Sequence, residues 1–173
     1  KNKYYKKYEE DDNLIIGKSD KNCDVYDVLV YADRNIKTIN IPSFIKKIAS
    51  FAFYGSSLEN VFIPSHITQI GLSCFSQCKK IQKVEFESNS NLEKIERFVF
   101  CGCTLTEISI PSSVIKIGEN AFANCVFLQN IEFSQNSKLQ CIEKDAFSST
   151  SIDSIEIPSS VLQLEEAVFS LIF

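Results

Sequence analysis

Seven cysteines and one histidine are the residues of this chain whose types could support metal binding, disulfide formation or catalysis. Three residues separate Cys74 from Cys78, and a single glycine separates Cys101 from Cys103. Thiolates at such short spacings occur in zinc sites and in disulfides, so both interpretations compete with simple packing of buried thiols. The only histidine is His66, and the pattern supplies no partners that would converge on it in a zinc site or a catalytic triad. We expect His66 to be an exposed corner residue.

The remaining polar residues do not indicate an enzyme. None of the five glycines lies in a G-x-G-x-x-G or P-loop arrangement that would hold phosphates. The Glu and Asp residues are scattered, without the isolation that general acid–base catalysis requires. We therefore expect a protein with no catalytic activity, no cofactor and no metal ion.

Charge and hydropathy exclude two further classes. The formal net charge is −4, whereas a nucleic-acid-binding protein needs a basic stripe that neutralises phosphates. No apolar run approaches the roughly 18 residues of a transmembrane helix. The chain starts at Lys1 rather than Met, so we expect a fragment or a processed product. The absence of a signal peptide or anchor from this sequence therefore carries no information about the full-length protein.

A repeated sequence pattern determines the secondary-structure elements that position these side chains. Its clearest copy is Leu105–Cys125, LTEISIPSSVIKIGENAFANC, and the same pattern occurs six times. The residues that close its I-x-I/F triplet follow one another at intervals of 22 to 24 residues: Ile41, Ile63, Phe86, Ile110, Phe133 and Ile157. A fixed period in the twenties predicts a leucine-rich-repeat solenoid.

Each copy divides into a strand, a corner and a second turn. The alternation Ile108-Ser109-Ile110 predicts a short strand with one buried face, and the Pro- or Asn-rich segment that follows predicts a corner. The segment Glu119–Asn124 lacks this alternation and predicts a helical turn. A small residue and a phenylalanine recur within it, and this phenylalanine column is Phe53, Phe75, Phe100, Phe122, Phe147 and Phe169.

The I-P-S-x-V segments (Ile110–Val114 and Ile157–Val161) and the A-F-x-x-C segment (Ala121–Cys125) resemble those of the BspA-like leucine-rich-repeat family, over about residues 35–169. The resemblance implies a right-handed solenoid with a short parallel strand and a helical turn in each of about six coils. It also implies a non-enzymatic protein–protein interaction module. Members of the family are mostly cell-surface or secreted adhesins and antigens, so we expect a surface antigen that binds host extracellular proteins or cells.

The repeat also accounts for the cysteines. Cys78, Cys103 and Cys125 share one column, three residues after the phenylalanine, and Cys74 occupies the small-residue column. We therefore favour packing over a disulfide or a metal site, since a buried thiol behaves as a small hydrophobe. An odd number of cysteines and the absence of an N-x-S/T sequon support an alternative, a cytoplasmic leucine-rich-repeat scaffold that binds a cytosolic partner.

Three segments are expected along the chain. Residues 1–20 form a charged N-terminal arm, in which Tyr8 is one of several tyrosines that could pack over the first coil or bind a partner. Residues 21–35 form an N-terminal capping strand region, for which Leu14–Ile16 is a candidate partner strand. Residues 36–173 form the repeat array, which we expect to be truncated after Phe173. Self-association through this uncapped C-terminal end is the alternative.

If the apolar columns point inward, the alternate residues of each strand face outward and form the candidate ligand-binding face. They are Thr38, Asn40, Asn60, Phe62, Lys83, Glu85, Glu107, Ser109, Asn130, Glu132, Ser154 and Glu156. This face is acidic toward its C-terminal half and carries one outward aromatic residue, Phe62, of a type enriched at interface hot spots. A solvated face that only maintains solubility is the competing interpretation.

Overall fold

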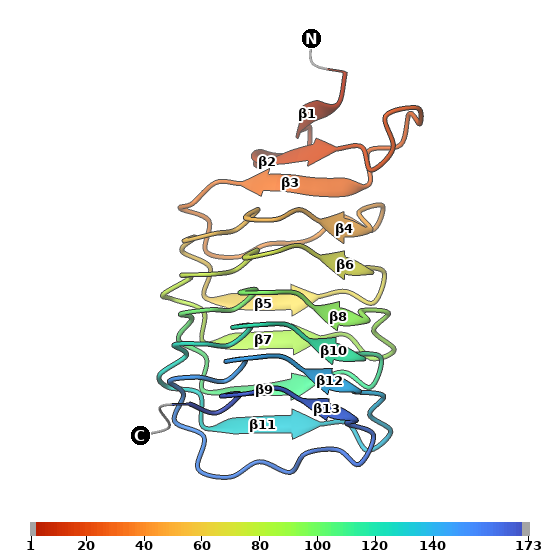
Figure 1. Ribbon diagram of the computed structural model, residues 1–173. Coiled ribbons are helices and arrows are strands. Elements are labelled where there is room, and N and C mark those ends of the chain that lie inside the picture. The colour runs from red at the N-terminus through yellow and green to blue at the C-terminus, as the bar shows by residue number, and fades with distance from the viewer. Residues whose placement is uncertain (1–2, 171–173) are drawn as a thin grey trace.

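The computed structural model describes residues 3–170, and this part of the chain contains thirteen β strands stacked as a solenoid (Figure 1). Two columns of strands run along the stack. The longer strands are β5 (Asn60–Ile63), β7 (Lys83–Phe86), β9 (Glu107–Ile110) and β11 (Asn130–Phe133). The two-residue strands are β4 (Lys47–Ile48), β6 (Gln69–Ile70), β8 (Lys94–Ile95), β10 (Lys116–Ile117), β12 (Cys141–Ile142) and β13 (Gln163–Leu164).

Every pairing between these coils is parallel and in register. β5 pairs with β7 and β9 pairs with β11, so that Val61 lies opposite Val84 and Ile108 lies opposite Ile131. The two-residue strands extend the stack on the other side, in the order β8-β10-β12-β13 for the last four. Parallel in-register stacking of equivalent residues confirms the predicted leucine-rich-repeat solenoid.

The phenylalanine column is the centre of the stack. Its six rings, Phe53, Phe75, Phe100, Phe122, Phe147 and Phe169, form a continuous ladder with centroid separations between 5.0 and 5.6 Å. Neighbouring ring planes differ by no more than 15°, and the first five side chains are fully buried. Aromatic contacts of this kind stabilise a core beyond the area that the rings bury.

The predicted helical turn is wrong in detail. Glu119–Asn124 forms consecutive turns, and no helix is found within residues 3–170. Asn120 and Asn124 both have positive φ angles, of 56° and 59°, and such left-handed residues cannot continue a right-handed helix. The same two positions are left-handed in other coils, as at Ser73 and Gln77. Amide groups there bond to the next coil instead, for example the Phe100 N–H to the Ala121 carbonyl.

Three antiparallel strands cover the first coil: β1 (Tyr5–Tyr8), β2 (Asp11–Gly17) and β3 (Val28–Ala32). β3 then pairs in parallel with β4, which joins this cap to the array (Figure 1). Much of the segment expected to be a charged arm is therefore strand, and Leu14 lies opposite Ala32 within the hairpin of β2 and β3. The expectations that concern Lys1 and Phe173 lie outside the described residues.

The buried cysteines pack as the repeat predicts and also form hydrogen bonds between coils. The thiols of Cys78, Cys103 and Cys125 each donate to a phenylalanine carbonyl of the preceding coil, with S···O distances of 3.0, 3.1 and 3.1 Å. All seven cysteines are free thiols. Burial raises the pKa of the Cys103 thiol well above its usual value and raises the pKa of Cys125 to about 12.

Cys23 should be modified first when the native protein is treated with iodoacetamide at pH 8. It is exposed, whereas Cys103 and Cys125 are buried and remain protonated because their pKa values lie above the reaction pH. Peptide mass mapping over time measures the order, and a sample in 6 M urea, in which all seven should react, is the control. Rapid native modification of Cys103 or Cys125 would contradict the burial of this column.

Candidate ligand-binding surfaces

The outward strand face is formed by the alternate residues of β5, β7, β9 and β11. In each strand the first and third residues are exposed, while the second points toward the core. The structure brings eight of the predicted face residues onto these paired strands: Asn60, Phe62, Lys83, Glu85, Glu107, Ser109, Asn130 and Glu132. They form one continuous surface, because β7 and β9 also lie side by side.

The other four predicted face residues lie in coils without a strand at this position. Thr38 and Asn40 precede β4 in the first coil, and Ser154 and Glu156 lie between β12 and β13 in the last. All four of these residues lie outside the core. They extend the face at its two ends but are not fixed by a strand ladder.

Specific contacts organise the polar groups of this outward strand face. Lys83 bonds to Glu85 at 2.6 Å, and this hydrogen bond raises the pKa of the Lys83 ammonium. Ser109 donates to Glu132 across the β9–β11 pair at 3.0 Å. Phe62, 47% exposed, lies opposite Glu85 on the neighbouring strand. The face therefore presents one apolar ring beside charged groups that are already partly paired.

A hollow of about 640 Å³ lies between β11 and the last coil. Five of the predicted face residues line this hollow: Glu107, Asn130, Glu132, Ser154 and Glu156. Its lining also includes Ser160, whose hydroxyl is buried and has no hydrogen-bond partner among the described residues. The acidic end of the outward strand face is therefore hollowed.

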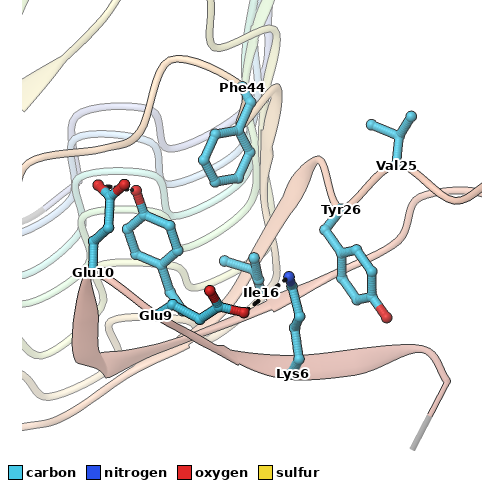
Figure 2. A pocket seen from close by; sticks show the side chains of 8 residues that line it. Lys6, Glu9, Glu10, Ile16, Val25, Tyr26 and Phe44 are labelled. Atoms are coloured by element: carbon cyan, nitrogen blue, oxygen red, sulfur yellow. Dashed lines mark hydrogen bonds and ion pairs between the residues drawn. The ribbon is translucent and has the colours of Figure 1, made fainter.

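A second hollow lies at the junction of the cap and the first coil, and the sequence did not predict it. This cap groove has a volume of about 350 Å³ and is lined by Lys6, Tyr8, Glu9, Glu10, Ile16, Val25, Tyr26 and Phe44. Figure 2 shows Phe44 above Ile16, with Lys6 below Ile16 and Tyr26 to the right. The periodic pattern gives no signal for it, because most of the lining comes from the cap, outside the repeat.

The aromatic residues of the cap groove are held by contacts with their surroundings. Tyr8 packs edge-on against Phe44, with ring centroids 5.6 Å apart, and donates its hydroxyl to Glu10 at 2.7 Å. This hydrogen bond to Glu10 raises the pKa of Tyr8. The Lys6 ammonium lies 4.9 Å from the centre of the Tyr26 ring and 4.0 Å from Glu9. Tyr8 thus packs over Phe44 of the first coil, which is one of the two roles considered for the tyrosines of residues 1–20.

The residues considered for metal binding and catalysis do not converge. Within residues 3–170 no group of three or more His, Cys, Asp and Glu side chains could hold a metal ion. His66 is partly buried rather than exposed, and its Nε2 atom has no hydrogen-bond partner in the described part of the chain. Residues 3–170 contain no helix that is long and apolar enough to cross a membrane.

Comparison with known proteins agrees with this architecture. A model of the BspA type leucine rich repeat region matches the chain in six copies, over residues 29–113 and 93–172. No curated protein matches the chain. Among solved structures, the pneumococcal vaccine antigen PcpA is similar with a TM-score of 0.80 and 23% sequence identity, over 98% of this chain and 48% of that one.

Two further solved structures are similar over most of the chain. A leucine-rich repeat protein from Bacteroides ovatus shares 28% identity with a TM-score of 0.73, over 82% of this chain and 37% of that one. A leucine rich cell surface protein from Faecalibacterium prausnitzii shares 21% identity with a TM-score of 0.59, over 92% of this chain and 50% of that one. The chain thus spans half or less of the length of these proteins. The repeat pattern, the stacked coils and the match to the family model show that the chain belongs to the BspA type leucine rich repeat family.

Proposed function

We propose that this chain is a non-enzymatic surface antigen or adhesin module that binds a host protein through its outward strand face. The observation that carries the proposal is the exposed ring of Phe62 on a regular, otherwise polar sheet surface. Aromatic residues surrounded by polar groups are typical anchors of protein interfaces. Solenoids commonly present such extended strand faces to their partners. The acidic groups toward Glu132 and Glu156 favour a partner with a basic surface.

The proposed location at the cell surface is motivated by proteins of the same fold. One is a vaccine antigen, and another is a cell surface protein. The free thiols favour a second candidate, an intracellular scaffold, because cysteines stay reduced in the cytosol. Antibody labelling of intact and permeabilised source cells separates the two. Labelling of intact cells supports the surface module, and labelling only after permeabilisation supports the scaffold.

Phe62→Ser combined with Glu132→Lys and Glu156→Lys should weaken capture of host extracellular proteins at least about 30-fold. Loss of an aromatic anchor costs about 2 kcal/mol or more, and reversed charges repel a basic partner. Immobilised wild-type and variant chains are compared against a panel of purified matrix proteins by surface plasmon resonance. The three side chains are exposed, so the melting temperature should change little.

The matched control carries the same kinds of substitution outside the outward strand face: Phe127→Ser with Glu93→Lys and Glu166→Lys. All three of these residues are exposed, and none lies on β5, β7, β9 or β11. This control should bind as the wild type does. Equal binding by all three proteins would exclude the outward strand face as the binding surface.

A further inference from the structure

We propose that the cap groove is a second binding site, which accepts an arginine side chain from an extended basic segment of a protein partner. The proposal does not depend on the function of the outward strand face. The cap groove lies at the N-terminal end of the stack, where β1 and β2 meet the first coil, whereas the strand face runs along β5 to β11 (Figure 1). The two surfaces share no residue.

The walls of the cap groove fit the apolar stem of a long side chain. Ile16 forms part of the lining and is only 2% exposed, so its surface inside the groove is continuous with the core. The rings of Tyr8 and Phe44 stand edge-on to each other, and Phe44 is still 40% exposed. Arginine and lysine commonly bury their methylene stems along such surfaces while the charged group stays at the rim. A volume of about 350 Å³ has room for one such side chain.

The rim of the cap groove carries the opposite charge. The side chain of Glu9 is 88% exposed, and the Glu10 carboxylate is held in place by the Tyr8 hydroxyl (Figure 2). A neighbouring hollow of about 440 Å³ shares Tyr8, Glu10 and Phe44 and adds Asp11. Carboxylates therefore lie on both sides of the Tyr8–Phe44 pair. This charge complementarity favours a segment with more than one basic residue over a single small cation.

Two lysine ammonium groups already lie against the ring of Tyr26, another residue of the lining. The Lys6 and Lys18 ammonium groups lie 4.9 and 5.2 Å from the centre of the Tyr26 ring. The Lys18 ammonium is paired with Asp24 at 2.8 Å, whereas the Lys6 ammonium is farther from its partner Glu9, at 4.0 Å. A guanidinium can displace this weaker contact, because it stacks on aromatic rings and bonds carboxylates in a bidentate manner. These properties favour arginine over lysine as the residue that enters.

The test titrates the protein with the peptide acetyl-Gly-Arg-Gly-Arg-Gly-amide, monitored by NMR of the aromatic side chains. The rings of Tyr8, Tyr26 and Phe44 should shift, and a peptide with citrulline in place of arginine should not shift them. Glu9→Gln with Glu10→Gln should weaken binding about tenfold, a loss within the range expected for two exposed ion pairs. The amide oxygen introduced by Glu10→Gln can still accept the Tyr8 hydroxyl, so the groove keeps its shape.

Lys6→Gln distinguishes a cationic from an anionic occupant. It removes an ammonium that competes for Glu9 and for the Tyr26 ring, so affinity for the arginine peptide should rise. A fall in affinity would overturn the proposal, and so would equal binding of the citrulline peptide. Glu132→Gln with Glu156→Gln is the matched control on the outward strand face and should leave the shifts unchanged. Loss of binding only in this control would place the peptide on that face and also overturn the proposal.

Discussion

Phe100→Ala is expected to lower the free energy of unfolding by about 3–5 kcal/mol, the usual cost of truncating a buried phenylalanine. Phe100 is fully buried, with stacked rings on both sides at 5.5 Å from Phe75 and 5.4 Å from Phe122. Its removal leaves a cavity in the middle of the ladder and deprives both neighbours of a stacking partner. Because each coil is stabilised mainly by the coils next to it, the loss falls on two interfaces together.

Urea denaturation followed by circular dichroism measures this effect. Phe127→Ala is the control, because Phe127 is 56% exposed and its truncation should change stability by less than about 0.5 kcal/mol. Phe100→Leu should fall between the two, since leucine fills part of the volume but cannot stack. A cost of less than about 1 kcal/mol for Phe100→Ala would show that the ladder does not determine the stability of the stack.

The ladder was predictable because a repeat converts sequence position into spatial position. Equivalent residues of the phenylalanine column have to lie one above another in successive coils, and the structure stacks Phe75 on Phe100 accordingly. The same logic placed Cys103 in a buried column. It also placed Phe62 on the outward side of its strand, although whether this face binds a partner stays a prediction.

The turn that replaces the predicted helix shows where periodicity stops being informative. A missing strand alternation leaves the backbone conformation open, and the left-handed position is occupied by Phe51, Ser73, Phe98, Asn120, Asp145 and Ala167 in successive coils. Only the Asn and Asp residues in this set are typical of such a conformation. Contacts with neighbouring coils fix the turn instead, as when the Phe98 N–H bonds to the Glu119 carbonyl.

The cap groove could not be predicted for a related reason. It depends on the contact of Tyr8 with Phe44, which lie in different parts of the chain and are not related by the repeat. The tyrosines of the N-terminal segment indicated that some aromatic packing was available. The position of the hairpin of β1 and β2 over the first coil then decides which aromatic residues meet.

Gly71→Ala is expected to cost about 3 kcal/mol of unfolding free energy, the upper part of the range for an overpacked core. Gly71 follows β6 and donates its N–H to the Ile48 carbonyl of the preceding coil at 2.9 Å. A Cβ atom at this position would lie 2.4 Å from the Ser50 nitrogen and 2.9 Å from the Ala49 carbonyl carbon. Both are backbone atoms, so relief requires the coils to separate rather than a side chain to rotate.

Gly55→Ala separates the effect of close coil packing from that of backbone conformation. Gly55 has a φ of 65°, but a Cβ atom there would meet nothing within 4 Å. Alanine at this position therefore carries only the cost of the left-handed conformation, about 1 kcal/mol. Urea denaturation of the two variants should rank Gly71→Ala well below Gly55→Ala in stability. Equal stabilities would mean that neighbouring coils move apart freely, which is incompatible with a stack whose ladders and buried thiol bonds depend on a fixed spacing.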